Sequence, residues 1–510
     1  MQPASHSTLT RRQTTLITVA LMLSIALAAL DALVVGTAMP TIVGSLGGVS
    51  LYSWLVAVYL LTSTTTVPVY GRLADMYGRK PIFLFGIGLF LVGSALCGLS
   101  QSMPQLIAFR AIQGLGAGAV QPIAMTIIGD IFSVEQRAKM QGLFSGVWGI
   151  SSFVGPPLGG LIVATLSWHW IFYVNLPIGI VALAFIVLFY RERVEHHARP
   201  VDVTGVLLLT GGITALLLAL QETGQTEGLS CLTLALLYAS AASLLGVFIW
   251  GQGHSDDPMV PLDLFRRPVI GIGYLVGFLA GLAQFGVGTY VPLFIQGPML
   301  GTALTVGTVT APTSIGWPIG SVVSGRFILR VGYKRVMLAG VAAISIGAGC
   351  LLFLTSDTPL LVLAAVNGVI GLGLGLSATP IIIAIQNAVA WKQRGVATAL
   401  NQFSRTMGGA VGVALMGSLL NAGLAARLAS ASALVGQPDP HGLINDLLDP
   451  AARLALSPAV ANALRAALAV SLNNLFFVAV GAGLLALLAT LFLFPDGSVE
   501  EHGRKIPPPT

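Results

Sequence analysis

Apolar stretches long enough to cross a membrane recur along almost the whole chain. A helix of about 20 apolar residues spans the ~30 Å hydrocarbon core of a bilayer. Fourteen such runs are centred near residues 25, 61, 90, 116, 151, 181, 212, 241, 282, 315, 346, 374, 409 and 480. The pattern therefore predicts an all-α polytopic membrane protein with fourteen spans.

The first run resembles a secretory signal only at its start, where Arg11 and Arg12 precede it. It is too long for a signal peptide, has no small-x-small cleavage site, and thirteen further runs follow it. We expect it to remain as the first membrane span.

Composition and charge support this interpretation. Hydrophobic residues make up 55% of the 510 residues and charged residues only 9%, against about 25% charged residues in an ordinary soluble domain. If the N-terminus is cytoplasmic, 20 of the 25 Lys and Arg residues fall in cytoplasmic segments; three lie on the opposite side and two, Arg110 and Arg405, inside spans. Such an excess fixes orientation during insertion. The net charge of +6 thus indicates a plasma-membrane protein with both termini cytoplasmic, and not a nucleic-acid partner.

An internal repeat divides the chain into similar halves. GRLADMYGRK at 71–80 aligns with GRFILRVGYK at 325–334, and the segment at 136–160 aligns with that at 393–417, with offsets of 254 and 257. Parallel halves of this kind are typical of membrane transporters. Each half holds six predicted spans, so two spans are left over between them.

The predicted domains follow from this count. Residues 1–196 form one six-helix bundle, 197–253 two inserted helices, and 254–510 a second six-helix bundle. Within the last domain, about 425–465 is a long extracytoplasmic segment that we expect to form one or two short amphipathic helices at the membrane surface. An extended connection and a functional flap are both open interpretations.

Asp31 is the acid in ALAALDALVV and lies deep in the first predicted span. An Asp at a span centre costs about 2.5–3.5 kcal/mol, so it indicates a functional site. Asp31 lies nine residues before Pro40, and Arg110 lies six residues after Pro104. At about 1.5 Å per residue, the two charges lie within about 5 Å of the same depth.

Two interpretations of this pair remain open. A nearby Arg favours the ionised carboxylate, whereas burial favours the protonated one. A site at which contact with Arg110 changes with conformation would therefore load and release a proton at Asp31. The alternative is a permanent buried pair that holds helices together.

Two short motifs are rich in glycine. One also contains two prolines, and the other contains charged residues. In GISSFVGPPLGG, close packing explains the glycines, including a GxxxG pair, while two prolines remove backbone donors and bend the span. In GRLADMYGRK we expect a short cytoplasmic turn, and Asp130 is a candidate partner for Arg79. The residues concerned are Gly149, Gly155, Pro156, Pro157, Gly159 and Gly160 in the first motif, and Gly71, Arg72, Asp75, Gly78, Arg79 and Lys80 in the second.

Arg405 lies near the midplane of the thirteenth predicted span, and no acid shares its depth. Carbonyl groups, water or an anionic group of a substrate are its candidate partners. We predict a substrate cavity lined by Arg405 and other polar residues within spans, for which interhelical hydrogen bonding is the alternative. The other candidates are Gln113, Gln284, Tyr290 and Asn401.

These motifs, with LDALVVGTAMP at 30–40 and LIAFRAIQGLGAG at 106–118, resemble the signatures of the major facilitator superfamily, specifically its fourteen-span drug:proton antiporters. The resemblance implies multidrug efflux of cationic or neutral amphipathic drugs and dyes. It also implies that Asp31 and Arg110 handle proton and substrate, that the 149–160 motif is the "antiporter motif", and that Asp75 latches the cytoplasmic gate.

No signature of an enzyme or a nucleotide-driven pump is present, such as GxxxxGK[ST] or HExxH. Three cysteines lack metal-ligand spacing. We therefore expect no cofactor, no metal and no enzymatic activity, and a monomer in the lipid bilayer whose partners are a small-molecule substrate and the proton. Export of a physiological lipid, siderophore or metabolite is the nearest alternative, and a channel or a sensor is a more distant one.

Overall fold

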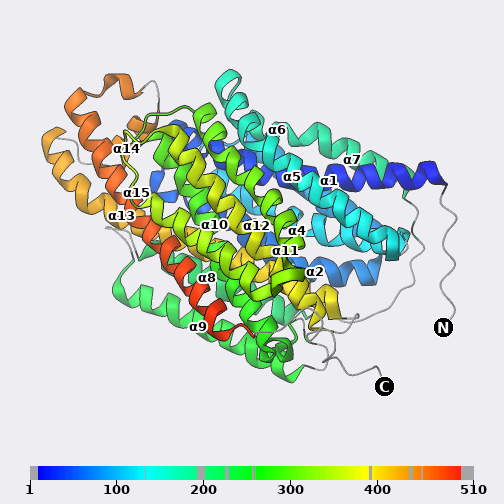
Figure 1. Ribbon diagram of the computed structural model, residues 1–510. Helices are drawn as coiled ribbons and strands as arrows, with labels where there is room; N and C mark the ends of the chain where they lie inside the picture. Colours follow the sequence, from blue (N-terminus) through cyan, green and yellow to red (C-terminus); the bar gives the residue numbers. More distant parts are fainter. Residues whose placement is uncertain are drawn as a thin grey trace.

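The structure is a computed structural model of the chain. It describes residues 10–132, 134–190, 192, 202–223, 229–255, 258, 260–389, 393–435, 440–449 and 452–495. Over these residues all regular secondary structure is helical (Figure 1).

The first half contains seven α-helices and one short 3₁₀ helix. Thr10 begins the first of them with a capping box, in which its side chain accepts from the Gln13 N–H. The elements are α1 (Arg11–Leu46), η1 (Val49–Leu51), α2 (Trp54–Tyr77), α3 (Arg79–Gly98), α4 (Met103–Ile131), α5 (Val134–Thr165), α6 (Trp170–Tyr173) and α7 (Asn175–Phe189).

Two helices separate this half from the second half. They are α8 (Val203–Glu222) and α9 (Cys231–His254). The second half then contains η2 (Leu262–Arg266), α10 (Pro268–Gln296), α11 (Ala303–Leu351), α12 (Leu360–Asn387), α13 (Arg394–Val435), α14 (Pro440–Leu448), η4 (Ala452–Ala455), α15 (Pro458–Leu488) and η5 (Ala489–Leu493).

Twelve helices in the described part of the chain are long and apolar enough to cross a membrane. All fourteen predicted span centres fall within helices. The two centres outside the twelve lie in α2 and in the part of α11 before Gly332, where polar stretches, TSTTT at 62–66 and TVTAPTS at 308–314, lower the hydropathy. These two helical segments follow the first helix of their respective halves.

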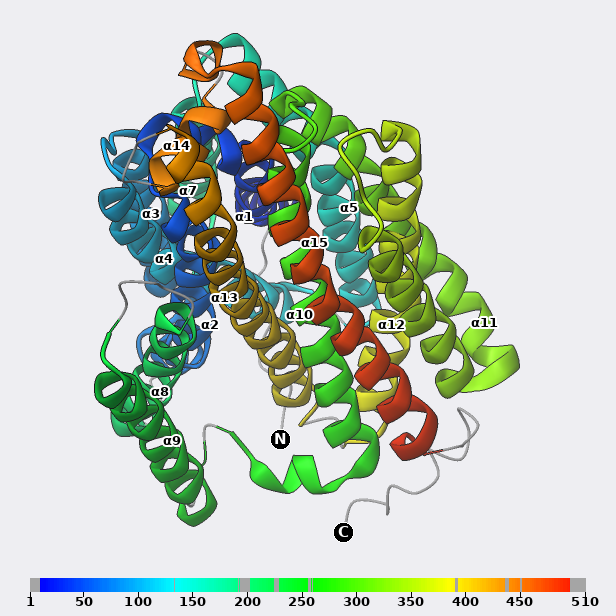
Figure 2. The same cartoon turned by 90° about the vertical axis from the view of Figure 1, so that its left-hand side faces the viewer.

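The two halves pack against each other through two pairs of helices. The α2 helix of the first half packs on α13 of the second, and α5 packs on α11. The inserted helix α8 contacts both α2 and α13, so it covers one seam between the halves (Figure 2). Gln221 of α8 accepts a hydrogen bond from the Ser53 hydroxyl at 2.7 Å and donates to the Ser50 carbonyl at 3.0 Å.

Hydrogen bonds join the halves near the connection 47–53, and we call this end of the molecule the 47–53 end. Gln296 of α10 accepts from the Thr41 hydroxyl at 2.8 Å and donates to the Thr37 carbonyl at 3.1 Å. The Tyr52 hydroxyl donates to the Thr289 carbonyl at 2.7 Å. Side-chain hydrogen bonds thus tie α1 and the 47–53 connection to α10.

Helix α14, in the segment where short amphipathic helices were predicted, covers the same end. Its Leu443, Ile444 and Leu447 are buried, and Asn445 accepts a hydrogen bond from the Val49 N–H at 3.3 Å. A Cβ on Gly44 of α1 would lie 2.9 Å from the Leu448 backbone. The apolar face of this short helix is therefore buried against the rest of the protein.

The expectation of a short turn over 71–80 was wrong in extent. Because α2 continues to Tyr77 and α3 begins at Arg79, Gly78 is the one residue between two helices. Its φ of 95° is in the left-handed region, as is the φ of 83° at the aligned Gly332, where α11 kinks. The internal repeat therefore extends to backbone conformation.

This shared conformation predicts the effect of alanine at each glycine pair. Gly78→Ala and Gly332→Ala each place a Cβ on a left-handed residue, at a cost of about 1–2 kcal/mol, and lower the thermal unfolding temperature of the detergent-solubilised protein. Gly71→Ala and Gly325→Ala are matched controls, because no atom lies within 4 Å of the added Cβ. Equal stability of all four variants contradicts the prediction.

Candidate functional site

Asp31 and Arg110 form an ion pair between α1 and α4, inside the first half. The Arg110 Nη1 lies 2.7 Å from the Asp31 Oδ2. Asp31 is 0% exposed and Arg110 2%. The structure thus brings together the two charges that the sequence places at one depth.

Amide side chains complete the hydrogen bonding of this carboxylate. Gln113 and Asn175 both donate to the Asp31 Oδ1, at 2.8 and 2.9 Å. Gln113 also accepts from Arg110 at 2.7 Å, and Asn175 donates to the Ser94 hydroxyl at 2.9 Å. Three donors thus surround one carboxylate. Residues of α1, α3, α4 and α7 therefore meet at Asp31.

An aromatic ring packs against the Arg110 side of this ion pair. The Arg110 guanidinium carbon lies 4.1 Å from the ring centroid of Tyr59 on α2, a cation–π contact. Ser94 donates to the Phe172 carbonyl on α6 at 2.9 Å. We call Asp31, Arg110, Gln113, Asn175, Ser94 and Tyr59 the Asp31 cluster. All six side chains are buried, so the cluster is closed to solvent in this conformation.

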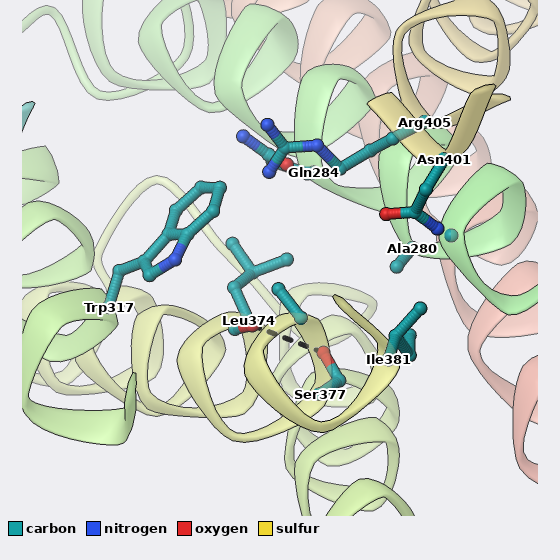
Figure 3. Close-up of a pocket in the computed structure, with 10 residues that line it drawn as sticks. Ala280, Gln284, Trp317, Leu374, Ser377, Ile381, Asn401 and Arg405 are labelled. Atoms are coloured by element: carbon teal, nitrogen blue, oxygen red, sulfur yellow. Dashed lines mark hydrogen bonds between the residues drawn. The ribbon is translucent and has the colours of Figure 1, made fainter. Parts of the chain in front are cut away.

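A separate pocket lies wholly in the second half (Figure 3). Its cavity volume is small, about 20 Å³, and it is partly open to solvent. Its walls come from four helices, α10, α11, α12 and α13. The lining residues are Gly277, Ala280, Gln284, Trp317, Leu374, Ser377, Ala378, Ile381, Asn401 and Arg405.

Arg405 is the one charged side chain among these lining residues. Its guanidinium carbon lies 5.0 Å from the ring centroid of Trp317, and its Nη2 donates to Gln402 at 3.0 Å. No carboxylate of the described residues pairs with it. The structure thus offers a ring face and a neighbouring amide in place of a counter-charge.

Two amide side chains of the pocket have unsatisfied atoms. Among the described residues, the Gln284 Oε1 and the Asn401 Nδ2 are buried without a hydrogen-bond partner. Asn401 is only 7% exposed. An unpaired buried polar group costs about 1–3 kcal/mol, which a hydrogen-bonding ligand offsets. The pocket therefore combines one cation, two amides and an apolar wall.

The structure separates the five candidate cavity residues into two groups. Gln284, Asn401 and Arg405 line the pocket. Gln113 belongs to the Asp31 cluster, and Tyr290 is fully buried, with its hydroxyl donating to the Val413 carbonyl at 3.0 Å. The role of each residue in substrate binding is a separate question from its position.

The glycines and prolines of 149–160 lie on α5, which continues as a helix through both prolines. A Cβ on Gly159 would collide with Thr37 of α1, and one on Gly160 would lie 2.6 Å from the Ala303 carbonyl oxygen of α11. The motif thus allows α5 to pack closely on its own half and on the other half.

The predicted gate residues lie at the end opposite the 47–53 end. The side chains of Arg72, Asp75 and Asp130 lie outside the described part of the structure, so the proposed latch and the Arg79–Asp130 pair remain predictions. The backbone N–H groups of Arg79 and Lys80 both donate to the carboxylate of Glu192, at 2.7 and 2.8 Å.

Glu192 was not predicted from the sequence. The residue before α3 is Gly78, which has no side chain to cap the helix. The carboxylate of Glu192, which follows α7, caps it instead, although Glu192 is 113 residues from Arg79 and 112 from Lys80 in the chain. A carboxylate is favourable at the positive end of a helix. Trp317 was missed as well, because a tryptophan in an apolar run carries no signal for the pocket that it lines.

Comparisons with known proteins assign the fold. The chain matches the Major Facilitator Superfamily model over residues 21–413. It is similar to the multidrug transporter protein MdtP of Bacillus subtilis (strain 168), with 36% identity over 94% of this chain and 93% of the relative. It is also similar to multidrug resistance protein 3 of the same organism, with 34% identity over 96% of each chain.

Among solved structures, the chain resembles a bacterial homologue of the human lysosomal transporter Spinster in an inward-facing, unoccupied conformation. The TM-score is 0.64 at 15% identity, over 95% of this chain and 98% of that chain. The protein therefore belongs to the Major Facilitator Superfamily and is a membrane-embedded transporter of small molecules.

The closed Asp31 cluster predicts strong energetic coupling within the ion pair. Removing one partner leaves the other charge buried without compensation, so Asp31→Asn and Arg110→Gln each destabilise the protein by about 3–5 kcal/mol. The double variant loses less than the sum of the two, because no lone charge remains. Thermal or denaturant unfolding of all four proteins in one detergent measures this coupling, and additive losses contradict it.

Proposed function

We propose that this protein is a proton-coupled antiporter that exports amphipathic drugs or dyes by alternating access. The similarity to two multidrug proteins over nearly their whole length supports the choice of cargo. The observation that carries proton coupling is the ionisable pair Asp31–Arg110, fully enclosed among membrane helices. An intramembrane acid is costly and is retained where it handles charge.

In this proposal the present conformation is open toward the cytoplasm. The distribution of Lys and Arg supports cytoplasmic termini in the plasma membrane, which makes the 47–53 end extracytoplasmic. That end is closed by α14 and by the hydrogen bonds of Gln296. The two more polar helical segments, α2 and the first part of α11, complete fourteen spans because each packs between apolar helices of the two halves.

Proton and substrate occupy different halves, so their coupling is conformational. No residue of the Asp31 cluster lines the pocket. Helix α1 carries Asp31 and, six residues later, Thr37, which accepts from Gln296 on α10. Helix α10 also carries Gln284 of the pocket. A shift of α1 on protonation of Asp31 is therefore transmitted directly to a pocket helix.

Mechanistically, Arg110 controls access of the proton. While its Nη1 contacts Asp31, the carboxylate stays ionised and enclosed. When the first half opens and the contact lengthens, burial without a cation favours the protonated acid. Proton entry on one side and release on the other then accompany substrate exit, in an exchange of about one proton per cycle, since no second carboxylate is found in the Asp31 cluster or the pocket.

Dye transport in inside-out vesicles tests the coupling. With a proton gradient, wild-type protein accumulates an amphipathic dye uphill, and collapse of the gradient abolishes accumulation. Asp31→Asn at matched expression lowers accumulation to the level of the collapsed gradient, because the amide cannot carry a proton. Asp263→Asn is a matched control, because Asp263 is exposed and lies outside the cluster.

Substrate exchange without a gradient separates coupling from folding in the same variant. Asp31→Asn still exchanges labelled for unlabelled dye, since exchange needs the pocket and the conformational cycle but no net proton movement. Full gradient-driven accumulation by Asp31→Asn refutes Asp31 as the proton carrier. A panel of lipids, siderophores and metabolites in the same vesicles distinguishes drug export from export of a physiological compound.

Closure at the 47–53 end gives a second, independent prediction. Val49→Cys and Asn445→Cys, in a background without Cys97, Cys231 and Cys350, place thiols where the backbone N–H of one contacts the side chain of the other. A short bis-methanethiosulfonate, which joins the two thiols through disulfides with release of methanesulfinate, then locks this end closed and stops transport, and reduction of the disulfides restores it. Unimpaired transport in the cross-linked protein contradicts alternating access at this end, and each single cysteine variant serves as the control.

A further inference from the structure

The pocket of the second half contains a positive charge without a negative one. Arg405 lines it, whereas its other residues are neutral. In the described residues the guanidinium contacts the face of Trp317 and one amide, that of Gln402. A guanidinium has five N–H donors, so most of its hydrogen-bonding capacity remains for a ligand.

The neighbouring side chains can complete an oxygen-binding site. Figure 3 shows the Arg405 guanidinium and Gln284 on one side of the pocket, Asn401 beside them, and Leu374 and Ile381 on the opposite wall. The Asn401 Nδ2 is a buried donor without a partner, and the Gln284 Oε1 is a buried acceptor without one, which suits a ligand that also carries a hydrogen-bond donor. A carboxylate accepts from both Arg405 and an amide, and arginine binds such groups in a planar, bidentate manner.

The rest of the pocket wall is apolar except for Ser377, whose hydroxyl donates to the Leu374 carbonyl at 3.2 Å. Ala280, Leu374 and Ile381 face the polar group, and the Trp317 ring lies at one side. Stacking on Trp317 also keeps the guanidinium directed toward the pocket, which makes Trp317 a positioning residue. A ligand with a flat apolar body and one anionic group matches both walls.

We propose that the pocket selects amphipathic compounds that carry a carboxylate or a similar anionic group, which binds Arg405. The proposal rests on the proposed export function and refines its substrate class, because the resemblance of the motifs alone implies cationic or neutral drugs. A cationic ligand meets Arg405 with like charge, and the described pocket lining holds no acid to offset it.

Binding of one fluorophore in three charge states tests the proposal. The probes are dansylglycine (anionic), its methyl ester (neutral) and N-(2-aminoethyl)dansylamide (cationic), added to purified protein in detergent micelles, with dansyl emission as the readout. We expect dansylglycine to bind about tenfold or more tightly than the ester, as for a hydrogen-bonded charge pair, and the amine to bind weakest.

Arg405 variants assign any preference to this side chain. Arg405→Gln abolishes the difference between dansylglycine and its ester while the affinity for the ester stays within about twofold. Arg405→Lys retains part of the difference, because it keeps the charge without the planar fork. Arg427→Gln is the matched control: Arg427 lies on the same helix, outside the pocket lining, and donates to the Gly423 carbonyl at 3.1 Å.

Several results overturn the proposal. Equal wild-type binding of the three probes, tightest binding of the amine, or absence of binding by all three argues against an anion-selective pocket. Equal weakening of all three by Arg405→Gln assigns Arg405 to packing against Trp317. If Arg405→Gln does not fold, the wild-type charge series and Arg405→Lys still decide the question.

The proposed export function fails independently of this preference. Because the binding measurements need no gradient, anion preference with no gradient-driven transport refutes coupled export and leaves the substrate class in place. Gradient-driven export of dye with no charge preference in binding refutes the proposed substrate class and leaves coupled export in place.

Discussion

The ion pair between Asp31 and Arg110 organises the first half of the protein. Two opposite charges removed from water are tolerable only when they pair closely and their remaining hydrogen-bonding groups are satisfied. Here α1 supplies the acid and α4 the base, and amides from α4 and α7 complete the shell. The pairing therefore holds these helices in register in this conformation.

The pocket of the second half differs from this cluster in its charge. Its Arg405 lacks an ionic partner among the described residues, and its amides Gln284 and Asn401 each have an atom without a hydrogen bond, as Asn175 of the Asp31 cluster also does. Satisfied polar groups favour rigidity, whereas unsatisfied ones favour a ligand. Helices α1 and α10 connect the two sites through Thr37, Thr41 and Gln296.

Helices α8 and α14 both attach where the halves meet. Helix α8 reaches α2 and α13, and its buried Gln221 binds Ser50 and Ser53. Helix α14 reaches η1 through Asn445. Because each contacts both halves, neither is a passive appendage of one bundle, and any change in the angle between the halves must alter its contacts.

The membrane class, the internal repeat and the depth of Asp31 and Arg110 were accessible from the sequence, because hydrophobicity, glycine positions and residue counting are local properties. The shared left-handed backbone at Gly78 and Gly332 follows from that repeat. The continuation of α2 beyond Gly71 could not be predicted from the sequence, because the residue type alone does not distinguish a glycine inside a helix from one that ends it.

Contacts between residues distant in the sequence were decided only by the tertiary structure. Nothing near Gly78 indicates that Glu192 caps α3, and nothing near Arg405 indicates that Trp317 supports it. Likewise Gln113 and Gln284 look alike as polar residues in spans, yet one satisfies Asp31 and the other lines the pocket. The sequence by itself determined which groups must be buried and at what depth. Helix packing decided which of them meet, because partners far apart in the chain are specified only by the three-dimensional arrangement.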